Sequence, residues 1–185
     1  MAKAESAEAV SIRSVADAVG VTPPSIYLHF ADKNELISAV VVDVFANLDR
    51  AMLAAGKGVE DPLKRLLAYG LAYVQFAVSH PEHYRVATMD PCPRPSVDTV
   101  LADSAFMHFG EVVKQCIEDG IFPPGDPLPI TLDLWSAAHG IAGLLIVKPF
   151  LPWGDVDEVA ERVLCAAAAG HTVEAKAISA HWSAR

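Results

Sequence analysis

The sequence predicts an all-α fold, made of a small helical pair near the N-terminus and a larger helical bundle. The chain has 185 residues, of which 52% are hydrophobic, enough for a sizeable buried core. Alanine and leucine are plentiful, and apolar residues recur at intervals of three and four. Regularly spaced valine and isoleucine are sparse outside these helix-like windows, which favours helices over a sheet.

Two short helices joined by a tight turn are predicted within residues 11–30. Ser11 is a suitable N-cap for the first helix, and Gly20 can adopt the left-handed conformation that ends it. Thr22 caps the second helix, and Pro23 takes its first position, where the missing N–H costs little. The helical spacing predicts one buried face for the pair: Ile12, Val15, Ala16, Val19, Ile26 and Phe30. This is the helix-turn-helix plan, whose second helix lies in the DNA major groove.

The remaining helices follow from their capping residues. Asp32 and Glu35 form a capping box that starts a long helix, which we expect to end near Ala55. Asp61 caps the next helix, and Pro81 ends it after His80. A short helix over 82–88 and a proline-rich loop over 91–95 come next.

Three further helices are predicted toward the C-terminus. Ser96 or Asp98 caps the first, which stops at Gly120 and leads into a loop beginning at Phe122. The second, over 129–147, is apolar all round and must be covered on every side. Asp155 caps the last, which extends from Val156 as far as Ala177.

The overall charge is unfavourable for nucleic-acid binding. Fourteen basic residues face 23 acidic ones, a net charge of −9, and residues 1–40 contain three basic against five acidic residues. Three cysteines show no close pairing, and the N-terminus is not a signal peptide, so we expect a reduced cytoplasmic protein. The longest apolar stretch, 134–147, is too short to span a bilayer.

An ordered motif follows the turn of the helical pair. Tyr27-Leu28-His29-Phe30 and then Asp32-Lys33-Asn34-Glu35-Leu36 resemble the end of the DNA-binding head in TetR-family transcriptional regulators. The resemblance implies a head over residues 1–45 that contacts bases and phosphates, with phosphate contacts from few cations, hydroxyls and helix N-termini. The DNA-binding residues that this predicts are Arg13, Thr22, Pro24, Ser25, Tyr27, His29 and Lys33.

The first helix of the head is the main departure from the family. TetR-family heads contain three helices, yet only ten residues precede Ser11, and Val10 is their one large aliphatic besides Met1. Two helices cannot cover their own apolar face. The chain therefore starts downstream of the true start, was trimmed, or has a naturally incomplete head, and we favour the first two explanations.

A second resemblance lies near the C-terminus. Leu134-Trp135, followed by His139-Gly140, is similar to the Trp-x-x-x-His-Gly signature of one TetR-like ligand-binding subclass. This implies a ligand-binding and dimerisation domain over residues 46–185, with a homodimer formed through the last two helices. The ligand pocket that we expect contains Tyr69, Tyr73, Phe76, Phe106, Phe109, Trp135 and His139. The alternative is that the aromatic residues are core and His139 is bonded to a backbone carbonyl.

No enzyme, metal or cofactor pattern accompanies these motifs. The sequence has no phosphate-binding glycine loop and no nucleophile elbow, and His80 and His83 have no third metal ligand. We therefore expect a dimeric repressor that a small, mostly apolar effector releases from a palindromic operator. The alternatives are a sensor of the same fold that binds DNA poorly, and a helical enzyme, for which no catalytic set is visible.

Overall fold

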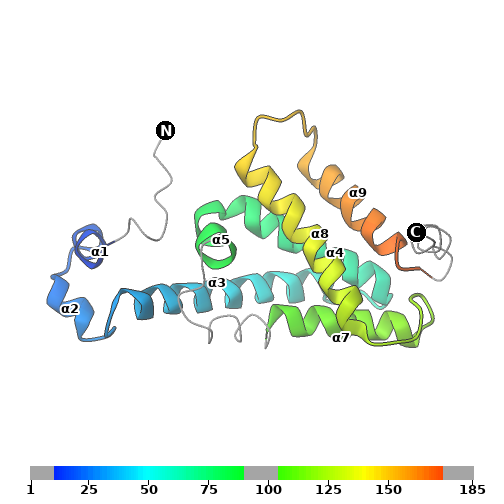
Figure 1. Ribbon diagram of the computed structural model, residues 1–185, viewed down its shortest axis with the longest axis horizontal. Helices are drawn as coiled ribbons and strands as arrows, with labels where there is room; N and C mark the ends of the chain where they lie inside the picture. Colours follow the sequence, from blue (N-terminus) through cyan, green and yellow to red (C-terminus); the bar gives the residue numbers. More distant parts are fainter. Residues whose placement is uncertain (1–10, 90–103, 173–185) are drawn as a thin grey trace, which may run out of the picture.

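The computed structural model describes residues 11–89 and 104–172, and within them the predicted all-α fold is confirmed, with eight helices and no strand. The long helix α3 (Lys33–Gly56) runs along the molecule (Figure 1). It joins α1 (Ile12–Val19) and α2 (Pro23–Tyr27), at one end, to the larger helical body at the other.

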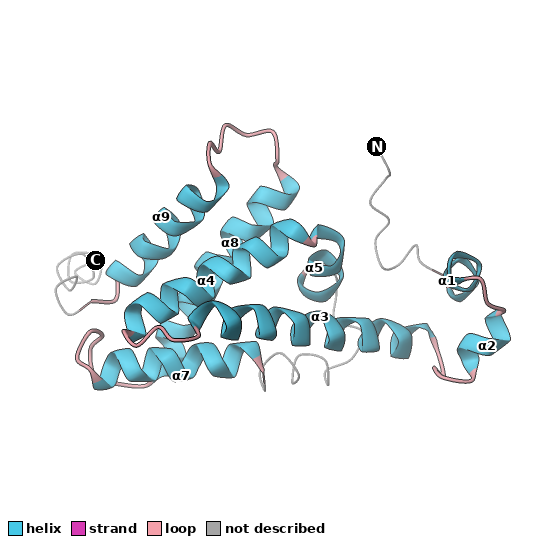
Figure 2. Ribbon diagram, turned by 180° about the vertical axis from the view of Figure 1, so that it is seen from behind, coloured by secondary structure: helices cyan, strands magenta, loops and turns pink. Residues whose placement is uncertain are grey.

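The helical body is organised around α4 (Pro62–Ser79), which packs against α3, α5, α7, α8 and α9. Figure 2 shows α9 on one side of α4 and α3 on the other, while α8 crosses α4 and also packs against α7. The bounds of these helices are α5 (Pro81–Thr88), α7 (Ala105–Glu118), α8 (Pro127–Val147) and α9 (Val156–Ala169).

The head forms as its capping residues predict. Ser11 and Ser14 form a reciprocal capping box at the start of α1, and Gly20 ends the helix with a φ of 74°. The side chains of Ile12, Ala16 and Ile26 are buried in a small core of their own, which Val15, Phe30 and Leu36 partly cover. The head therefore has a core separate from that of the body.

Two details of the head differ from expectation. Val19, predicted to be buried, is 65% exposed, because it lies in the last turn of α1 where no described element covers it. Thr22 precedes α2, but its hydroxyl makes no bond to the helix backbone and lies 2.9 Å from the hydroxyl of Ser25. The expectation of a missing first helix concerns residues 1–10, which lie outside the described residues.

The helix α3 belongs to both parts of the molecule. Asp32 accepts a hydrogen bond from the Glu35 N–H at 2.8 Å, which caps the helix as predicted. From Val41 and Phe45 onward its buried side chains join the core of the body. The domain boundary between residues 45 and 46 stays a prediction, since α3 crosses it without a break.

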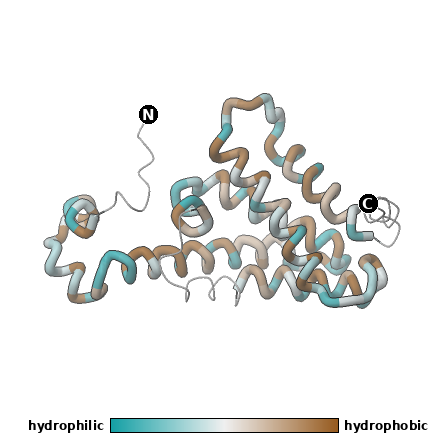
Figure 3. The backbone as a smooth tube through the Cα atoms, in the orientation of Figure 1, coloured by the Kyte–Doolittle hydropathy of each residue, from teal (hydrophilic) through white to brown (hydrophobic). Residues whose placement is uncertain are grey.

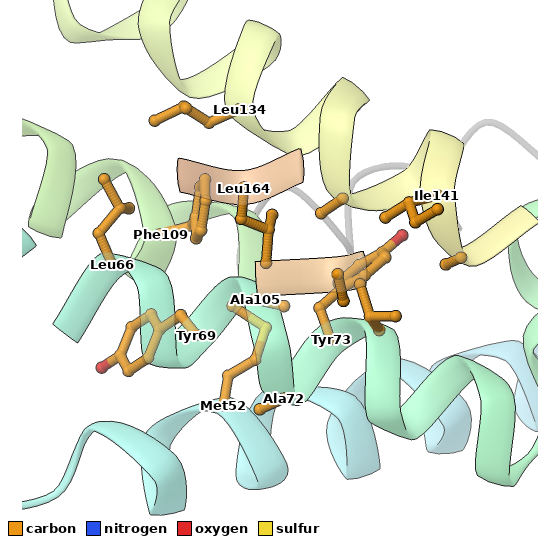
Figure 4. Packing of buried hydrophobic residues seen from close by; sticks show 14 of the residues in the cluster. Met52, Leu66, Tyr69, Ala72, Tyr73, Ala105, Phe109, Leu134, Ile141 and Leu164 are labelled. Carbon is orange, nitrogen blue, oxygen red and sulfur yellow. The ribbon is translucent and has the colours of Figure 1, made fainter. Parts of the chain in front are cut away.

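The main core fills the space between α3, α4, α7, α8 and α9. Figure 4 shows Met52 between α3 and α4, and Tyr73 of α4 pointing toward Ile141 of α8. A hydrogen bond also ties α3 to α7, where His108 Nδ1 and Asp49 Oδ1 are 2.7 Å apart. These contacts hold the body end of α3 firmly against α4 and α7.

The helix α8 is longer than the apolar stretch that predicted it. It begins at Pro127 and has 21 residues. By length and composition alone such a helix could cross a membrane, but the core helix of a soluble protein meets the same two criteria. The stretch 134–147 is only part of this helix, so the expectation that it is too short on its own is not tested by the length of α8. Figure 3 shows apolar residues along much of α8. Only 39% of its most apolar window is buried within the chain, so much of this helix lacks a cover in one copy.

The end of the last helix differs from the expectation. The last helix was expected to reach as far as Ala177, but α9 ends at Ala169, with Gly170 as its C-cap. The helix start predicted at Ser96 or Asp98 lies outside the described residues, and α7 begins at Ala105. Glycine has the lowest helix propensity after proline, which accounts for the earlier end of α9.

Gly56 allows the end of α3 to approach α4 closely. A Cβ atom at Gly56 would overlap Cε1 of Tyr69, whose ring is largely buried. We expect Gly56→Ala to lower the free energy of unfolding by about 1–3 kcal/mol, measured by urea denaturation. Gly110→Ala is the matched control, because its Cβ would meet Thr131 at an ordinary 3.7 Å. Equal stability of the two variants would contradict the close approach.

Candidate nucleic-acid interface and ligand pocket

The predicted DNA-binding residues all lie in the head or at the start of α3. Tyr27 is the last residue of α2 and is 55% exposed, and His29 follows it on the exposed turn. Arg13 and Thr22 are also exposed, as is Pro24, whereas Ser25 and Lys33 are half-buried. Their roles in binding DNA stay predictions, but the side chains of Tyr27 and His29 are free of the protein interior, as such roles require.

The acidic residues of the head are less repulsive to DNA than their number suggests. Asp32 accepts from the Glu35 N–H, and the Glu35 carboxylate accepts from the N–H of Ala31. Both carboxylates therefore sit at the N-terminus of α3, where the helix dipole offsets negative charge. Among the acidic residues described in the head, Asp17 and Asp43 lie on exposed helix surfaces away from such a terminus.

A cluster of three polar side chains lies inside the body. The hydroxyl of Tyr84 is 2.7 Å from Nδ1 of His139 and 2.8 Å from the hydroxyl of Tyr73, which lies 3.3 Å from the same Nδ1. These residues come from α4, α5 and α8, so the cluster links three helices. The expected partner of His139 was a backbone carbonyl, but the two tyrosine hydroxyls occupy that position instead.

Burial keeps every member of this cluster uncharged near neutral pH. It raises the pKa of Tyr73 to about 12, and it raises the pKa of Tyr84 as well. Burial also lowers the pKa of His139 below its usual value, because no acidic group offsets the loss of hydration. His139 is therefore a neutral imidazole at pH 7, and Nδ1 can accept a hydrogen bond.

A narrow apolar pocket adjoins the cluster. It is lined by Met52 of α3, by three residues of α7, and by residues of α4 and α8; the full lining is Met52, Gly70, Tyr73, Ala105, Phe106, Phe109, Trp135 and Ala138. The cavity volume is only about 10 Å³, which is about what one water molecule requires. A larger ligand must therefore displace side chains, and Met52 is the most adaptable of them.

The structure brings together part of the predicted pocket. Tyr73, Phe106, Phe109 and Trp135 line it, and the His139 ring lies 5.4 Å from the Trp135 ring. Tyr69 instead borders a separate surface hollow at the end of α3, and burial raises the pKa of its hydroxyl. Phe76 stacks on His80 at the end of α4. These two aromatic residues are therefore away from the described pocket.

Sequence reasoning missed Tyr84, the residue at the centre of the polar cluster. Its helix, α5, has only eight residues, so the apolar spacing was too short to distinguish a buried face. Its side chain is nevertheless completely buried. The sequence does contain one signal, a single tyrosine in a short helix that follows a proline break. A tyrosine that is buried at such a place needs a polar partner for its hydroxyl.

The neutral state of His139 predicts a dependence of stability on pH. The unfolded chain binds a proton on this imidazole near pH 6.5, whereas the folded chain does so only at lower pH, because burial lowers the pKa. Stability is therefore fully present above about pH 6.5 and falls as the pH drops below it. We expect the melting temperature of the wild type to fall more between pH 7.5 and 5 than that of His139→Asn. Parallel curves would contradict a lowered pKa.

The described residues contain no group of three or more histidine, cysteine, aspartate and glutamate residues that could hold a metal ion. Burial raises the pKa of the Cys116 thiol to about 11, so this cysteine is a poor nucleophile. Neither observation points to a reaction centre in residues 11–89 and 104–172.

Comparison with known families agrees with the resemblance to TetR-family regulators, while the Trp-x-x-x-His-Gly subclass stays a prediction. Residues 66–167 match the family described as the tetracyclin repressor-like C-terminal domain, and residues 2–40 match bacterial regulatory proteins of the tetR family. The C-terminal match spans more than half of the chain. The chain therefore belongs to the TetR family, and its fold is that of a TetR-family DNA-binding regulator.

Several solved structures share this fold. A protein of unknown function from Rhodococcus sp. RHA1 is 25% identical, with a TM-score of 0.76 over 89% of this chain and 86% of that one. The TetR-family regulator PfmR from Thermus thermophilus is 19% identical, with a TM-score of 0.69 over 88% and 90%. AibR, solved with isovaleryl coenzyme A and operator DNA, is 18% identical, with a TM-score of 0.63 over 85% and 86%. No curated protein matches the chain.

Proposed function

We propose that this protein is a cytoplasmic repressor that binds a palindromic operator as a homodimer and is released by a small, mostly apolar effector. The observation that carries the proposal is the course of α3. One unbroken helix begins with Lys33 at the head and places Met52 in the wall of the pocket. The two residues are about 28 Å apart along the helix axis. A change in the pocket wall is therefore connected directly to the head.

The head supplies the proposed contacts with DNA. Tyr27 and His29 are exposed where the family motif contacts the DNA backbone, and Arg13 and Lys33 are the cations beside them. Pro24 can contribute only apolar contact, for example with a thymine methyl group. Because the head carries few cations, we propose that two heads about 34 Å apart provide specificity through their spacing.

The exposed face of α8 supports a homodimer. Leu132, Ser136, Gly140 and Leu144 recur at every fourth position on the side of the helix opposite its buried residues. Small residues in the middle of this stripe let a second helix approach closely, and Leu132 and Leu144 at its ends are exposed. A twofold partner would bury the same stripe on both copies.

The effector acts through a difference in affinity between two conformations. The pocket as described holds about one water, so a ligand of several carbons requires an open form with displaced side chains. AibR, which has the same fold, has been solved with both an acyl coenzyme A and operator DNA, and this supports a regulator that binds both kinds of molecule. Opening the pocket shifts α3, and with it the head, away from the geometry that the operator needs.

A mobility-shift experiment tests the proposal. The DNA upstream of the protein's own gene should be retarded by the purified protein, and the complex should contain two copies of the chain by sedimentation. Shuffled DNA of equal length and composition is the control. No retardation at any salt concentration would overturn the repressor and favour the sensor of the same fold, which the acidic composition would suit.

A further inference from the structure

Trp135 carries a polar atom that the protein leaves without a partner. Its indole Nε1 is buried and makes no hydrogen bond of ordinary geometry. The indole does offset a small part of the rise that burial causes in the pKa of Tyr73. Trp135 and Tyr73 both line the narrow pocket. Because an indole nitrogen can only donate, the group that it lacks is a hydrogen-bond acceptor.

The Trp135 N–H makes no hydrogen bond of ordinary geometry in either tautomer of His139. If Nδ1 accepts, Tyr84 donates to it and Tyr73 donates to Tyr84, so both hydroxyls of the cluster are used within it. If Nδ1 carries the proton, it donates to Tyr84, Tyr84 donates to Tyr73, and the Tyr73 O–H is then unused as well. Both arrangements leave at least one donor on residues that line the pocket.

No described residue that lines the pocket balances a negative charge. The eight described lining residues are uncharged, and the imidazole of His139 beside them is neutral near pH 7. A buried carboxylate without a cationic partner is strongly disfavoured. A neutral acceptor, by contrast, needs only the donor that is already present.

We propose that the pocket selects a small, uncharged, apolar molecule with one hydrogen-bond acceptor, such as a ketone or ester carbonyl, which accepts from Trp135 Nε1. This inference rests on the proposed effector-binding function and names the chemical class of the effector. The hydrocarbon part occupies the space between Phe106, Phe109 and Met52. The Phe106 ring packs edge-on against Trp135, with centroids 6.1 Å apart, and moves aside to admit it.

The inference can be tested on the full chain without DNA. The probes are 2-alkanones of about five to nine carbons, with alkanes and alkanoates of equal length as comparisons. We expect a ketone to bind at least about tenfold more tightly than its matched alkanoate and alkane. On binding, the indole N–H resonance of Trp135 should move downfield in the ¹H–¹⁵N spectrum.

Trp153 is the internal control, because its Nε1 already donates to the Lys148 carbonyl at 2.8 Å and its resonance should not move. Trp135→Phe should lose the preference for ketones, whereas Trp153→Phe should keep it. Alkanoates that bind as tightly as ketones, or an unmoved Trp135 resonance at saturation, would overturn the inference, as would no ketone binding at millimolar concentration. If Trp135→Phe does not fold, the indole N–H resonances of Trp135 and Trp153 in the wild-type protein still test the inference. Failure to bind DNA would leave this result unaffected, so the two proposals fail separately.

Discussion

Replacing Tyr27 with alanine is expected to abolish operator binding while leaving the fold and the proposed dimer intact. The side chain is more than half exposed and packs in neither core, so its removal costs little stability. Each lost DNA contact costs about 1–3 kcal/mol, and the proposed complex contains two heads. The affinity should therefore fall about 30-fold to 20,000-fold, measured by fluorescence anisotropy with labelled operator.

Two further variants separate the causes of this loss. Tyr27→Phe keeps the ring and removes only the hydroxyl, so it shows how much of the effect is a polar contact with phosphate. Lys114→Ala removes an exposed cation from α7, at the opposite end of the molecule from the head (Figure 1), and should leave the affinity unchanged. Wild-type affinity in Tyr27→Ala would count strongly against the assignment of the interface.

Replacing Phe122 with alanine is expected to have the largest effect on stability. Phe122 is 0% exposed, its ring lies 6.2 Å from that of His171, and its N–H donates to the Cys116 carbonyl at 3.1 Å. Truncating a buried phenylalanine costs about 3–5 kcal/mol. In a chain of this length, the melting temperature should fall by about 6–20 °C, measured by thermal unfolding.

Phe150→Ala is the matched control, since it deletes the same atoms from a side chain that is 91% exposed. Its free energy of unfolding should lie within about 0.5 kcal/mol of the wild type. A similar loss of stability in both variants would show that Phe122 is not part of the core.

The contrast between Phe122 and the helix-capping residues shows which features of the fold a sequence pattern can predict. Helix caps depend only on residues close in sequence, and those predicted at the ends of α1, α3 and α4 lie where the sequence places them: Ser11, Gly20, Asp32 and Asp61. Phe122 lies in a connection, where no periodicity distinguishes a buried side chain from an exposed one. Its burial depends on how α7 and the end of α9 meet, which only the tertiary structure determines.

The candidate site shows the same difference between contacts that are local in sequence and contacts that are distant in sequence. Trp135 and His139 are four residues apart, so one turn of helix brings their rings close, as expected. The contacts of His139 with Tyr73 and Tyr84 instead span 66 and 55 residues of sequence, and no local pattern reports them. Tyr69 and Phe76 share helix α4 with Tyr73, yet their positions on the helix direct them away from the pocket.

In the proposed repressor, the continuity of α3 makes it a lever arm with its pivot in the pocket wall. No proline interrupts it between Lys33 and Gly56, so we expect it to tilt as a rod rather than bend. A tilt of about 5° at Met52 would displace the Lys33 end by about 2.5 Å, given the rise of about 1.5 Å per residue. A displacement of that size separates a hydrogen-bonded pair. Under this proposal, a rearrangement of one or two side chains around a small molecule is magnified into loss of register with the double helix.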